Sequence, residues 1–429
     1  HSVAHPDERA QVREYLIDRL ESMGADTVMQ FRYDSIVGPQ NKHVEYTFDA
    51  VNLLAEFAPA SETVSGTDLM LVAHYDSRYS QPMPRDTVWS YGAADDGYGV
   101  GVILETVSLA LKNRAEWKQG IKVLFTDAEE PGMKGMKAIW ENNREVFDNV
   151  GLVLNVEARG TWGPALLFEA CPGNAKVQEL YASTAAYPFT YSLTTVVYQF
   201  LPMFTDFTIV KDELPGLNFS NIADVNHYHT DLDNFSNISE KTIQHYGSQI
   251  LPLTMEYLTG EEYADKDYLR SDSDKVNFTI PLLGLFSFSK VGYIVLCVAV
   301  FVLFLLAFAL EGLRGRIKAA KVFGFSLKVL GGSVLALLIG EGFAYACAAA
   351  AGAEFKLFGT VQGVPFDNKA MILFMVLMFA ACVLLYVSGR TKAARSVSGS
   401  MRASAVTNAV TGNALSVLYG VLALQFVFS

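Results

Sequence analysis

The sequence predicts an α/β domain followed by an all-α membrane domain. In roughly the first 260 residues, apolar runs of strand length alternate with runs that repeat at the helical period. Several strand-like runs end in acidic or histidine side chains, and open α/β sheets bind ligands at the carboxyl ends of their strands. The last 150 or so residues carry long uncharged apolar runs, as membrane-spanning helices do. We therefore expect a mixed, mostly parallel sheet flanked by helices, and then several transmembrane helices.

Length and composition exclude some classes of protein. A chain of 429 residues is too long for one ordinary domain. Its net charge of −12, without a basic patch interleaved with aromatic residues, argues against a nucleic-acid partner. The four cysteines include no CxxC pair, so neither a cysteine zinc site nor a disulfide framework is indicated. Nothing in the composition indicates an oligomeric state.

The chain opens with a helix and two strands. Asp7 and Glu8 suit the first turn of a helix, and Gly24 suits its end. β-Branched and aromatic residues then favour strands over residues 28–33 and 44–57. Because the chain starts at a histidine rather than a methionine, we expect a fragment or a processed form.

The stretch from residue 69 to residue 101 carries the first candidate site. Its apolar run has the length of a buried strand, and His74 and Asp76 follow it on the same side of the extended chain. Asp95 and Asp96 precede a helix-periodic run. Imidazole and carboxylates suit Zn²⁺, and Asp76 could orient the ring of His74. Alternatively, Asp95 and Asp96 are helix caps and His74 is a histidine at a strand end.

Further candidates lie at the ends of later segments. Residues 121–126 and 151–156 read as strands, and each is followed by acidic residues. A loop after residue 219 then carries histidines. These side chains are Glu129, Glu130, Glu157 and His229.

Five motifs occur in order: H-x-D, G-A-x-D-D-G-x-G, D-A-E-E, N-x-E and Y-H-T-x-x-D. This series resembles the M28 family of di-zinc peptidases, over roughly residues 1–260. Residues 155–158, 165–170 and 205–207 are most similar to its endoplasmic-reticulum metallopeptidase branch. The resemblance implies a zinc aminopeptidase-like fold, a peptide substrate and two zinc ions per chain.

The resemblance also implies a role for each site residue. Asp95 would bridge the two ions and would be followed by a cis peptide bond. His74 and Glu157 would complete one ion, and Glu130 and His229 the other, all with ligand types that zinc accepts. Many family members have Asp at the position of Glu157.

Three residues are expected to support the chemistry. Glu129 would be the general base, taking a proton from the attacking water. Tyr228 could donate a hydrogen bond to the oxyanion, or it could be a packed aromatic. Asp76 would act behind His74. The expected function is a membrane-anchored, zinc-dependent aminopeptidase; the alternatives are a single-zinc glutaminyl cyclase-type acyltransferase and a catalytically idle receptor or scaffold.

Two arginines lie in the loop that would line the mouth of this site. Arg78 and Arg85 could meet a substrate carboxylate, although a solvated surface role suits each of them equally. Residues 173–187 and 239–259 are expected to be helices that cover the sheet.

The sequence divides the chain into three parts. The peptidase domain is expected over residues 1–262 and a charged linker with an interfacial segment over 263–288. The membrane domain is expected over residues 289–429. Its four spans are expected at about 291–310, 329–351, 370–388 and 405–428.

Basic residues indicate the orientation in the bilayer. They follow the first and third spans, so both of these loops are expected in the cytoplasm and the peptidase domain on the other side, outside the cell or in an organelle lumen. Glu341 lies within the second span and is either a functional carboxylate or one placed near the interface. The basic residues are Arg314, Arg316, Lys318 and Lys321, then Arg390, Lys392, Arg395 and Arg402.

Four N-x-[ST] sequons are also present. They would be glycosylation candidates in a eukaryotic lumen, but such triplets also arise by chance. They begin at Asn218, Asn234, Asn237 and Asn277.

Overall fold

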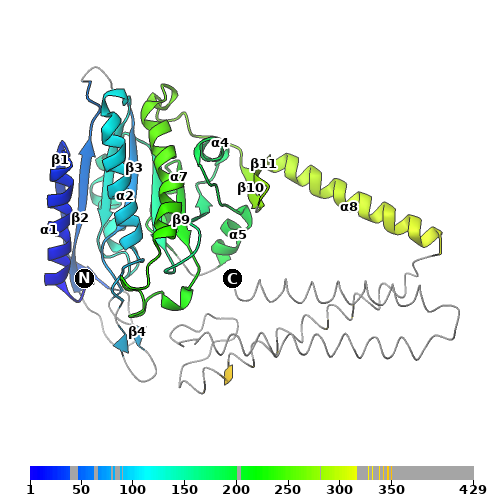
Figure 1. Cartoon of the computed structure of the whole chain (residues 1–429), viewed down its shortest axis with the longest axis horizontal. Coiled ribbons are helices and arrows are strands. Elements are labelled where there is room, and N and C mark those ends of the chain that lie inside the picture. The colour runs from blue at the N-terminus through cyan, green and yellow to red at the C-terminus, as the bar shows by residue number, and fades with distance from the viewer. Residues whose placement is uncertain are drawn as a thin grey trace. The chain divides into compact units, whose positions relative to one another are not determined.

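The structure, a computed structural model, describes most of the first 315 residues (Figure 1). The described ranges are 1–38, 47–61, 66–78, 81–82, 87–88, 90–200, 204–280 and 282–315, with isolated positions between 327 and 349. One compact unit comprises residues 1–81 and 87–298. The α/β fold described below lies in this unit.

A seven-stranded mixed sheet forms the centre of the unit, in the order β1-β2-β6-β3-β7-β9-β8. The neighbours among β6, β3, β7 and β9 are parallel, and the other three pairings are antiparallel. The expected mixed sheet is therefore confirmed, with half of its pairings parallel rather than most. The strands are β1 (Thr27–Val37), β2 (Thr47–Phe57), β3 (Asp68–His74), β6 (Gly120–Thr126), β7 (Val150–Ala158), β8 (Leu166–Ala170) and β9 (Gly216–Asn221). A separate two-stranded sheet pairs β4 (Gln81–Pro82) with β5 (Thr87–Val88).

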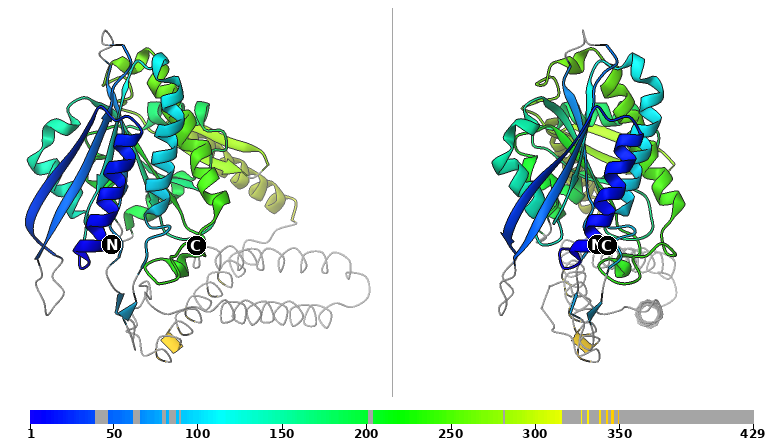
Figure 2. Two further views of the ribbon diagram at one scale, coloured as in Figure 1. Left: turned by 60° about the vertical axis from the view of Figure 1, so that its left-hand side comes forward. Right: turned by 90° about the vertical axis from the view of Figure 1, so that its left-hand side faces the viewer.

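Helices cover both faces of the sheet. Three of them, α1, α2 and α7, lie on one face in front of the strands (Figures 1 and 2), while α3 packs against β1 and β2 from the other side. The helices of this unit are α1 (Pro6–Ser22), α2 (Gly97–Ala110), α3 (Lys134–Asn142), α4 (Ala175–Thr184), α5 (Ser192–Phe200), α6 (Phe207–Val210) and α7 (Glu240–Thr259). Short 3₁₀ turns are η1 (Leu111–Glu116), η2 (Arg144–Phe147), η3 (Val225–His227) and η4 (Glu262–Ala264).

Local sequence explains where the covering helices begin and end. α1 starts with a proline in its first turn, buries Leu16 and Leu20, and is followed by Gly24 at φ +84°. α7 begins where the Ser239 side chain accepts a hydrogen bond from the Thr242 amide. The helices expected over residues 239–259 and 173–187 are therefore present, the second one shortened to α4.

The segment after η4 forms a hairpin, which the sequence did not lead us to expect. β10 (Lys275–Ile280) pairs antiparallel with β11 (Gly284–Ser289). The sequence predicted a linker with an interfacial segment here, whereas the structure has two paired strands, the second of which begins at Gly284. Helix α8 (Lys290–Leu313) follows directly.

Within the described residues, one helix is long and apolar enough to cross a bilayer, over Lys290–Leu310. It coincides with the first expected span, and its side chains are not buried by the rest of the chain. The spans expected at 329–351, 370–388 and 405–428, together with Glu341, lie outside the continuously described part of the chain.

Candidate metal centre

Five side chains from five segments meet at one edge of the sheet. β3, β6, β7 and β9 are parallel, so their carboxyl ends lie at the same edge. The side chains extend from the end of β3, the start of α2, the turn after β6, the end of β7 and the loop after β9. They are His74, Asp95, Glu130, Glu157 and His229.

Two groups of three potential ligands share Asp95. In the first group, His74 Nε2 lies 3.2 Å from Asp95 Oδ1 and 3.7 Å from Glu157 Oε2. In the second, His229 Nε2 lies 3.2 Å from Asp95 Oδ2 and 3.1 Å from Glu130 Oε2. Within each group the ligand atoms lie within 4.8 Å of one another. Asp95 thus presents one carboxylate oxygen to each histidine.

The residues present fit metal ions. Three buried atoms of this cluster, Asp95 Oδ2, Glu130 Oε1 and His229 Nε2, have no partner in hydrogen-bond geometry among the described residues, although Asp95 Oδ2 and His229 Nε2 are only 3.2 Å apart. Buried polar atoms are normally satisfied, so such atoms need an explanation, and a bound cation is one. Imidazole nitrogens with carboxylate oxygens form a donor set that suits zinc.

Asp233 and Asp96 position the backbone around Asp95. The Asp233 carboxylate accepts hydrogen bonds from the Ala94 amide at 2.7 Å and the Asp95 amide at 3.2 Å. The Asp96 carboxylate accepts one from Gly99 at 2.9 Å, which caps α2. Asp95 and Asp96 were both considered as helix caps, and only Asp96 caps α2. The Asp95–Asp96 peptide is cis, as expected from the family resemblance.

Asp76 supports the site in two ways. Its backbone carbonyl accepts a hydrogen bond from His74 Nδ1 at 2.8 Å, whereas its carboxylate Oδ1 lies 3.6 Å from that nitrogen. The carboxylate instead accepts hydrogen bonds from the amides of Glu129 at 2.9 Å and Glu130 at 3.3 Å. The ring of His74 is therefore oriented by the main chain of Asp76, and the side chain of Asp76 holds the turn after β6.

Glu129 has the electrostatic surroundings of a proton acceptor. Desolvation by burial raises the pKa of its carboxyl well above the usual value, and the nearby Glu157 carboxylate raises it further. His74 acts in the opposite direction. A carboxyl with a raised pKa takes up a proton more readily near neutral pH than an ordinary glutamate does.

Asp206 is a buried acid next to Glu129 that sequence reasoning assigned no role. Its Oδ2 accepts a hydrogen bond from the Thr126 hydroxyl at the end of β6. Burial raises the pKa of Asp206 to about 6. Its charge also raises the pKa of Glu129. The only signal in the sequence was the Thr205-Asp206-Phe207 triplet used for the family resemblance.

Tyr228 stacks on a candidate ligand. Its ring lies 3.6 Å from that of His229 between centroids, with 23° between the planes. The guanidinium of Arg159 lies 5.6 Å from the Tyr228 ring and 5.9 Å from the Tyr198 ring. Arg159 follows Glu157 by two residues, and sequence reasoning missed it because nothing in the sequence indicated that α5 brings Tyr198 to this side of the sheet.

Arg78 lies beside Glu130, not free in the mouth of the site. Its Nη1 donates to the Glu130 carbonyl at 2.6 Å and lies 3.4 Å from Glu130 Oε2. These contacts favour a structural role over the suggested contact with a substrate carboxylate. Arg85, the other arginine considered, lies outside the described residues.

A buried ion pair connects α1 to the turn that carries Glu129. Arg9 Nη1 lies 3.2 Å from Asp127 Oδ1, and Arg9 Nη2 donates to the Asp49 carbonyl at 2.8 Å. Asp127 Oδ2 accepts a hydrogen bond from the Val51 amide at 2.8 Å. The first residue of the D-A-E-E motif is therefore fixed to both α1 and β2.

Comparison with known proteins supports the resemblance found in the sequence. The family model "Peptidase family M28" matches residues 52–254. Endoplasmic reticulum metallopeptidase 1 of Mus musculus is 26% identical over 259 residues, which cover 58% of this chain and 27% of the mouse protein. The vacuolar membrane protease of Eremothecium gossypii is 28% identical over 262 residues, 57% of this chain and 24% of that protein. The chain thus matches about a quarter of the length of these relatives.

Solved structures resemble this chain at lower sequence identity than these relatives do. A zinc-dependent exopeptidase from Parabacteroides distasonis is 21% identical with a TM-score of 0.43, covering 56% of this chain and 88% of that one. A glutaminyl cyclase from Porphyromonas gingivalis is 20% identical with a TM-score of 0.45, covering 57% and 88%. Neither similarity distinguishes between the two activities. The resemblance to M28 peptidases is confirmed by the family match.

Proposed function

Since residues 52–254 belong to peptidase family M28, we propose that the chain is a membrane-anchored zinc metallopeptidase that removes residues from the N-termini of peptides. The observation that carries the proposal is the position of Asp95 between two histidines, each paired with a second carboxylate. One shared aspartate between two His-carboxylate pairs is the arrangement a two-ion site needs.

Each side chain of the cluster has a role in this proposal. His74 and Glu157 would hold one zinc ion, Glu130 and His229 would hold the other, and Asp95 belongs to both ligand groups. When bound, the two ions would polarise the scissile carbonyl and lower the pKa of the attacking water. Asp76 orients the ring of His74 through its main-chain carbonyl and holds the turn that carries Glu129 through its carboxylate.

Glu129 moves the proton. It is adjacent to Glu130 but not part of either ligand group, so its carboxylate is left to accept a proton from the attacking water. It then delivers this proton to the leaving amine. Burial and the nearby Glu157 carboxylate raise the pKa of Glu129, which favours uptake of the proton.

Tyr228 is proposed as a donor to the developing oxyanion. Its ring is held against His229, which brings the residue next to the second ligand group. A hydroxyl there would stabilise negative charge that appears only in the transition state. If the residue only packs on His229, Tyr228→Phe should leave kcat unchanged.

We further propose an extracytoplasmic peptidase domain on a four-span membrane domain. The candidate span in α8 supports membrane attachment, and so does the similarity to an endoplasmic reticulum metallopeptidase and a vacuolar membrane protease. The basic residues after the first and third expected spans favour a cytoplasmic position for both loops. The proposed parts are residues 1–262, 263–288 and 289–429.

One experiment tests the proposed activity against its alternatives. The purified chain is analysed for zinc and digested against a peptide library with free and blocked N-termini. We expect two zinc ions per chain and cleavage only of free N-termini. One ion per chain with cyclisation of N-terminal glutamine would instead indicate a glutaminyl cyclase. Two ions without hydrolysis of any peptide would indicate a scaffold.

A further inference from the structure

The β10–β11 hairpin has one apolar and one mostly polar face. Residues opposite each other in an antiparallel pair point to the same side of the sheet. The register pairs Val276 with Phe288, Phe278 with Phe286 and Ile280 with Gly284. We call Val276, Phe278, Ile280, Phe286 and Phe288 the apolar face. The other side carries Asn277 and Ser287, then Thr279 and Leu285.

The mostly polar face and the outer edge of β10 are bound to the peptidase domain. The Asn277 amide donates to Ser192 Oγ at 2.8 Å, and its buried side chain donates to Gln178 Oε1. The Thr279 hydroxyl donates to the Pro188 carbonyl at 3.1 Å, and Leu285 packs against the main core. The hairpin is therefore a fixed part of the domain. Its orientation is the reverse of that expected in water, where the apolar side of a hairpin is normally the one that faces the core.

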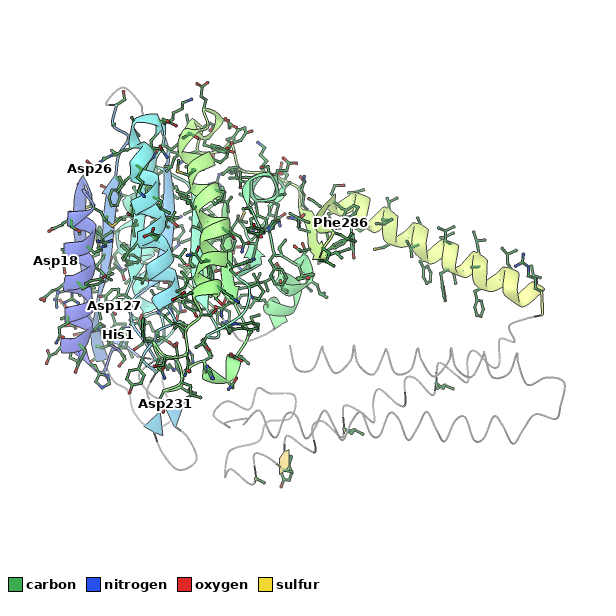
Figure 3. All side chains as sticks on the ribbon, viewed as in Figure 1. His1, Asp18, Asp26, Asp127, Asp231 and Phe286 are labelled. Carbon is green, nitrogen blue, oxygen red and sulfur yellow. The ribbon has the colours of Figure 1, made fainter. Side chains whose placement is uncertain are left out.

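Aromatic rings join the apolar face to the start of α8. Phe278 stacks on Phe286 with 5.7 Å between centroids and on Phe288 with 5.8 Å. Phe288 lies 6.3 Å from Tyr293, which is in the first turn of α8. Figure 3 labels Phe286 on the hairpin, next to the start of α8.

The turn of the hairpin extends this apolar surface. Leu282 and Leu283 are 104% and 71% exposed, although leucine side chains favour burial. On the apolar face itself, Ile280 is 36% exposed and the other four side chains are partly exposed. Exposed apolar residues next to one another mark sites of interaction with a membrane or with another protein.

The candidate membrane span limits how far the hairpin can be from a bilayer. Its 21 residues extend for about 31 Å as a helix, close to the 30 Å of a hydrocarbon core. Lys290 is then at the interface, where a lysine can reach the headgroups. The Lys290 amide donates to the Asp274 carbonyl at 3.0 Å, and its Nζ lies 3.1 Å from Asp274 Oδ2. No linker separates the hairpin from the span.

We propose that the apolar face and the turn of the hairpin lie in the interfacial layer of the bilayer, in contact with phospholipid. The partner is a lipid surface, because the hairpin ends where the span begins and its apolar face is continuous, through Phe288 and Tyr293, with the first turn of that span. The contact would fix the orientation of the peptidase domain at the membrane. This inference does not depend on the proposed peptidase activity.

Spin-label accessibility tests the proposal in the full chain reconstituted in phosphatidylcholine vesicles. With the native cysteines replaced, single cysteines are introduced as L283C at the turn, F286C on the apolar face and S287C on the opposite face. We expect the labels at 283 and 286 to collide more with oxygen than with a water-soluble nickel chelate. The matched control at 287 should show the reverse, because this exposed position faces away from lipid.

Two results would overturn the proposal. Labels at 283 and 286 that collide with the nickel chelate as freely as the label at 287 would mean that the face is in water. Labels at both positions that are protected from oxygen and nickel alike would mean that another part of the chain, or a second copy, covers the face. Leu283 is exposed at the turn and contributes little to packing, so L283C gives an answer even if F286C fails to fold.

Discussion

The carboxylate of Asp76 accepts a hydrogen bond from the backbone amide of Glu129, with 2.9 Å between Oδ1 and N. This contact joins the end of β3, which carries a candidate metal ligand, to the turn after β6, which carries the proposed base. The direction of the Glu129 side chain therefore depends on a residue that touches neither substrate nor water in the proposed mechanism.

Replacing Asp76 should lower the rate without emptying the site. Asp76→Asn keeps the shape of the side chain but replaces one acceptor oxygen by a donor, which cannot satisfy both amides of the turn. We expect kcat to fall by about 10- to 100-fold, as for other residues that orient a metal site from behind. The measurement is kcat together with bound zinc. The matched control is Asp18→Asn, at an exposed position of α1. An unchanged kcat would show that the turn is held without Asp76.

Substitutions of Glu129 and Glu130 should distinguish the general base from the metal ligand. Glu129→Gln cannot accept the proton, so kcat should fall by about 10²–10⁴ while zinc and substrate affinity are kept. Glu130→Gln should weaken binding of one zinc ion, and added zinc should partly restore activity. Zinc content and kcat are measured for both variants side by side. Loss of metal in Glu129→Gln but not in Glu130→Gln would mean that the two roles are reversed.

Asp206 should make the stability of the zinc-free chain depend on pH. Burial raises the pKa of Asp206 to about 6 from 3.8, so the folded state holds the proton more tightly than the unfolded state. The resulting stability is fully present below about pH 4 and is lost as the pH rises through about 6. Asp206→Asn cannot titrate, so its Tm relative to the unaltered chain should rise between pH 4 and pH 7. A Tm difference that does not change with pH would contradict this assignment.

Cys171 should be inert. Burial raises the pKa of its thiol to about 11, so very little thiolate is present at pH 8. Iodoacetamide should leave Cys171 unmodified in the folded chain and modify it after denaturation, as mass spectrometry of the Cys171 peptide would reveal. Cys171→Ser should retain full activity. Rapid modification of the native thiol would contradict this expectation.

Charge should determine the orientation in the membrane. Replacing Arg314, Arg316, Lys318 and Lys321 with glutamine removes the residues expected to keep that loop in the cytoplasm, so insertion should be disturbed. A cysteine-labelling scan with an impermeant reagent measures which side each loop occupies. Labelling near Lys318 from outside in the unaltered chain would contradict the orientation.

The sequence predicted five of the seven strands of the central sheet, β1, β2, β3, β6 and β7, whereas β8, β9 and the β10–β11 hairpin were not predicted. Each apolar run bounded by acids or histidines became a strand of the sheet, because burial on both faces leaves a continuous apolar signal. The clustering of His74, Asp95, Glu130, Glu157 and His229 then follows from parallel pairing, which brings strand ends to one edge.

Residues that act through long-range burial could not be predicted. Asp206 and Asp233 lie in motifs that carry the family resemblance, but their contacts could not be predicted, because it is the fold that buries them against Thr126 and the amide of Asp95. Burial also bears on two of the sequons. Asn218 and Asn277 are fully buried, and their side chains donate hydrogen bonds to neighbours, so the folded chain cannot carry a glycan at either position.

Because of the ion pair between Arg9 and Asp127, the segment that must fold together is longer than the segment that matches the family model. The family match begins at residue 52, yet the cation that neutralises Asp127 comes from α1. A fragment trimmed to the matched residues would leave a buried carboxylate without its partner, which typically costs 3–5 kcal/mol. The loss would fall on the turn that carries Glu129. Removal of α1 by proteolysis before β1 should therefore abolish the proposed activity without touching any residue of the matched family region.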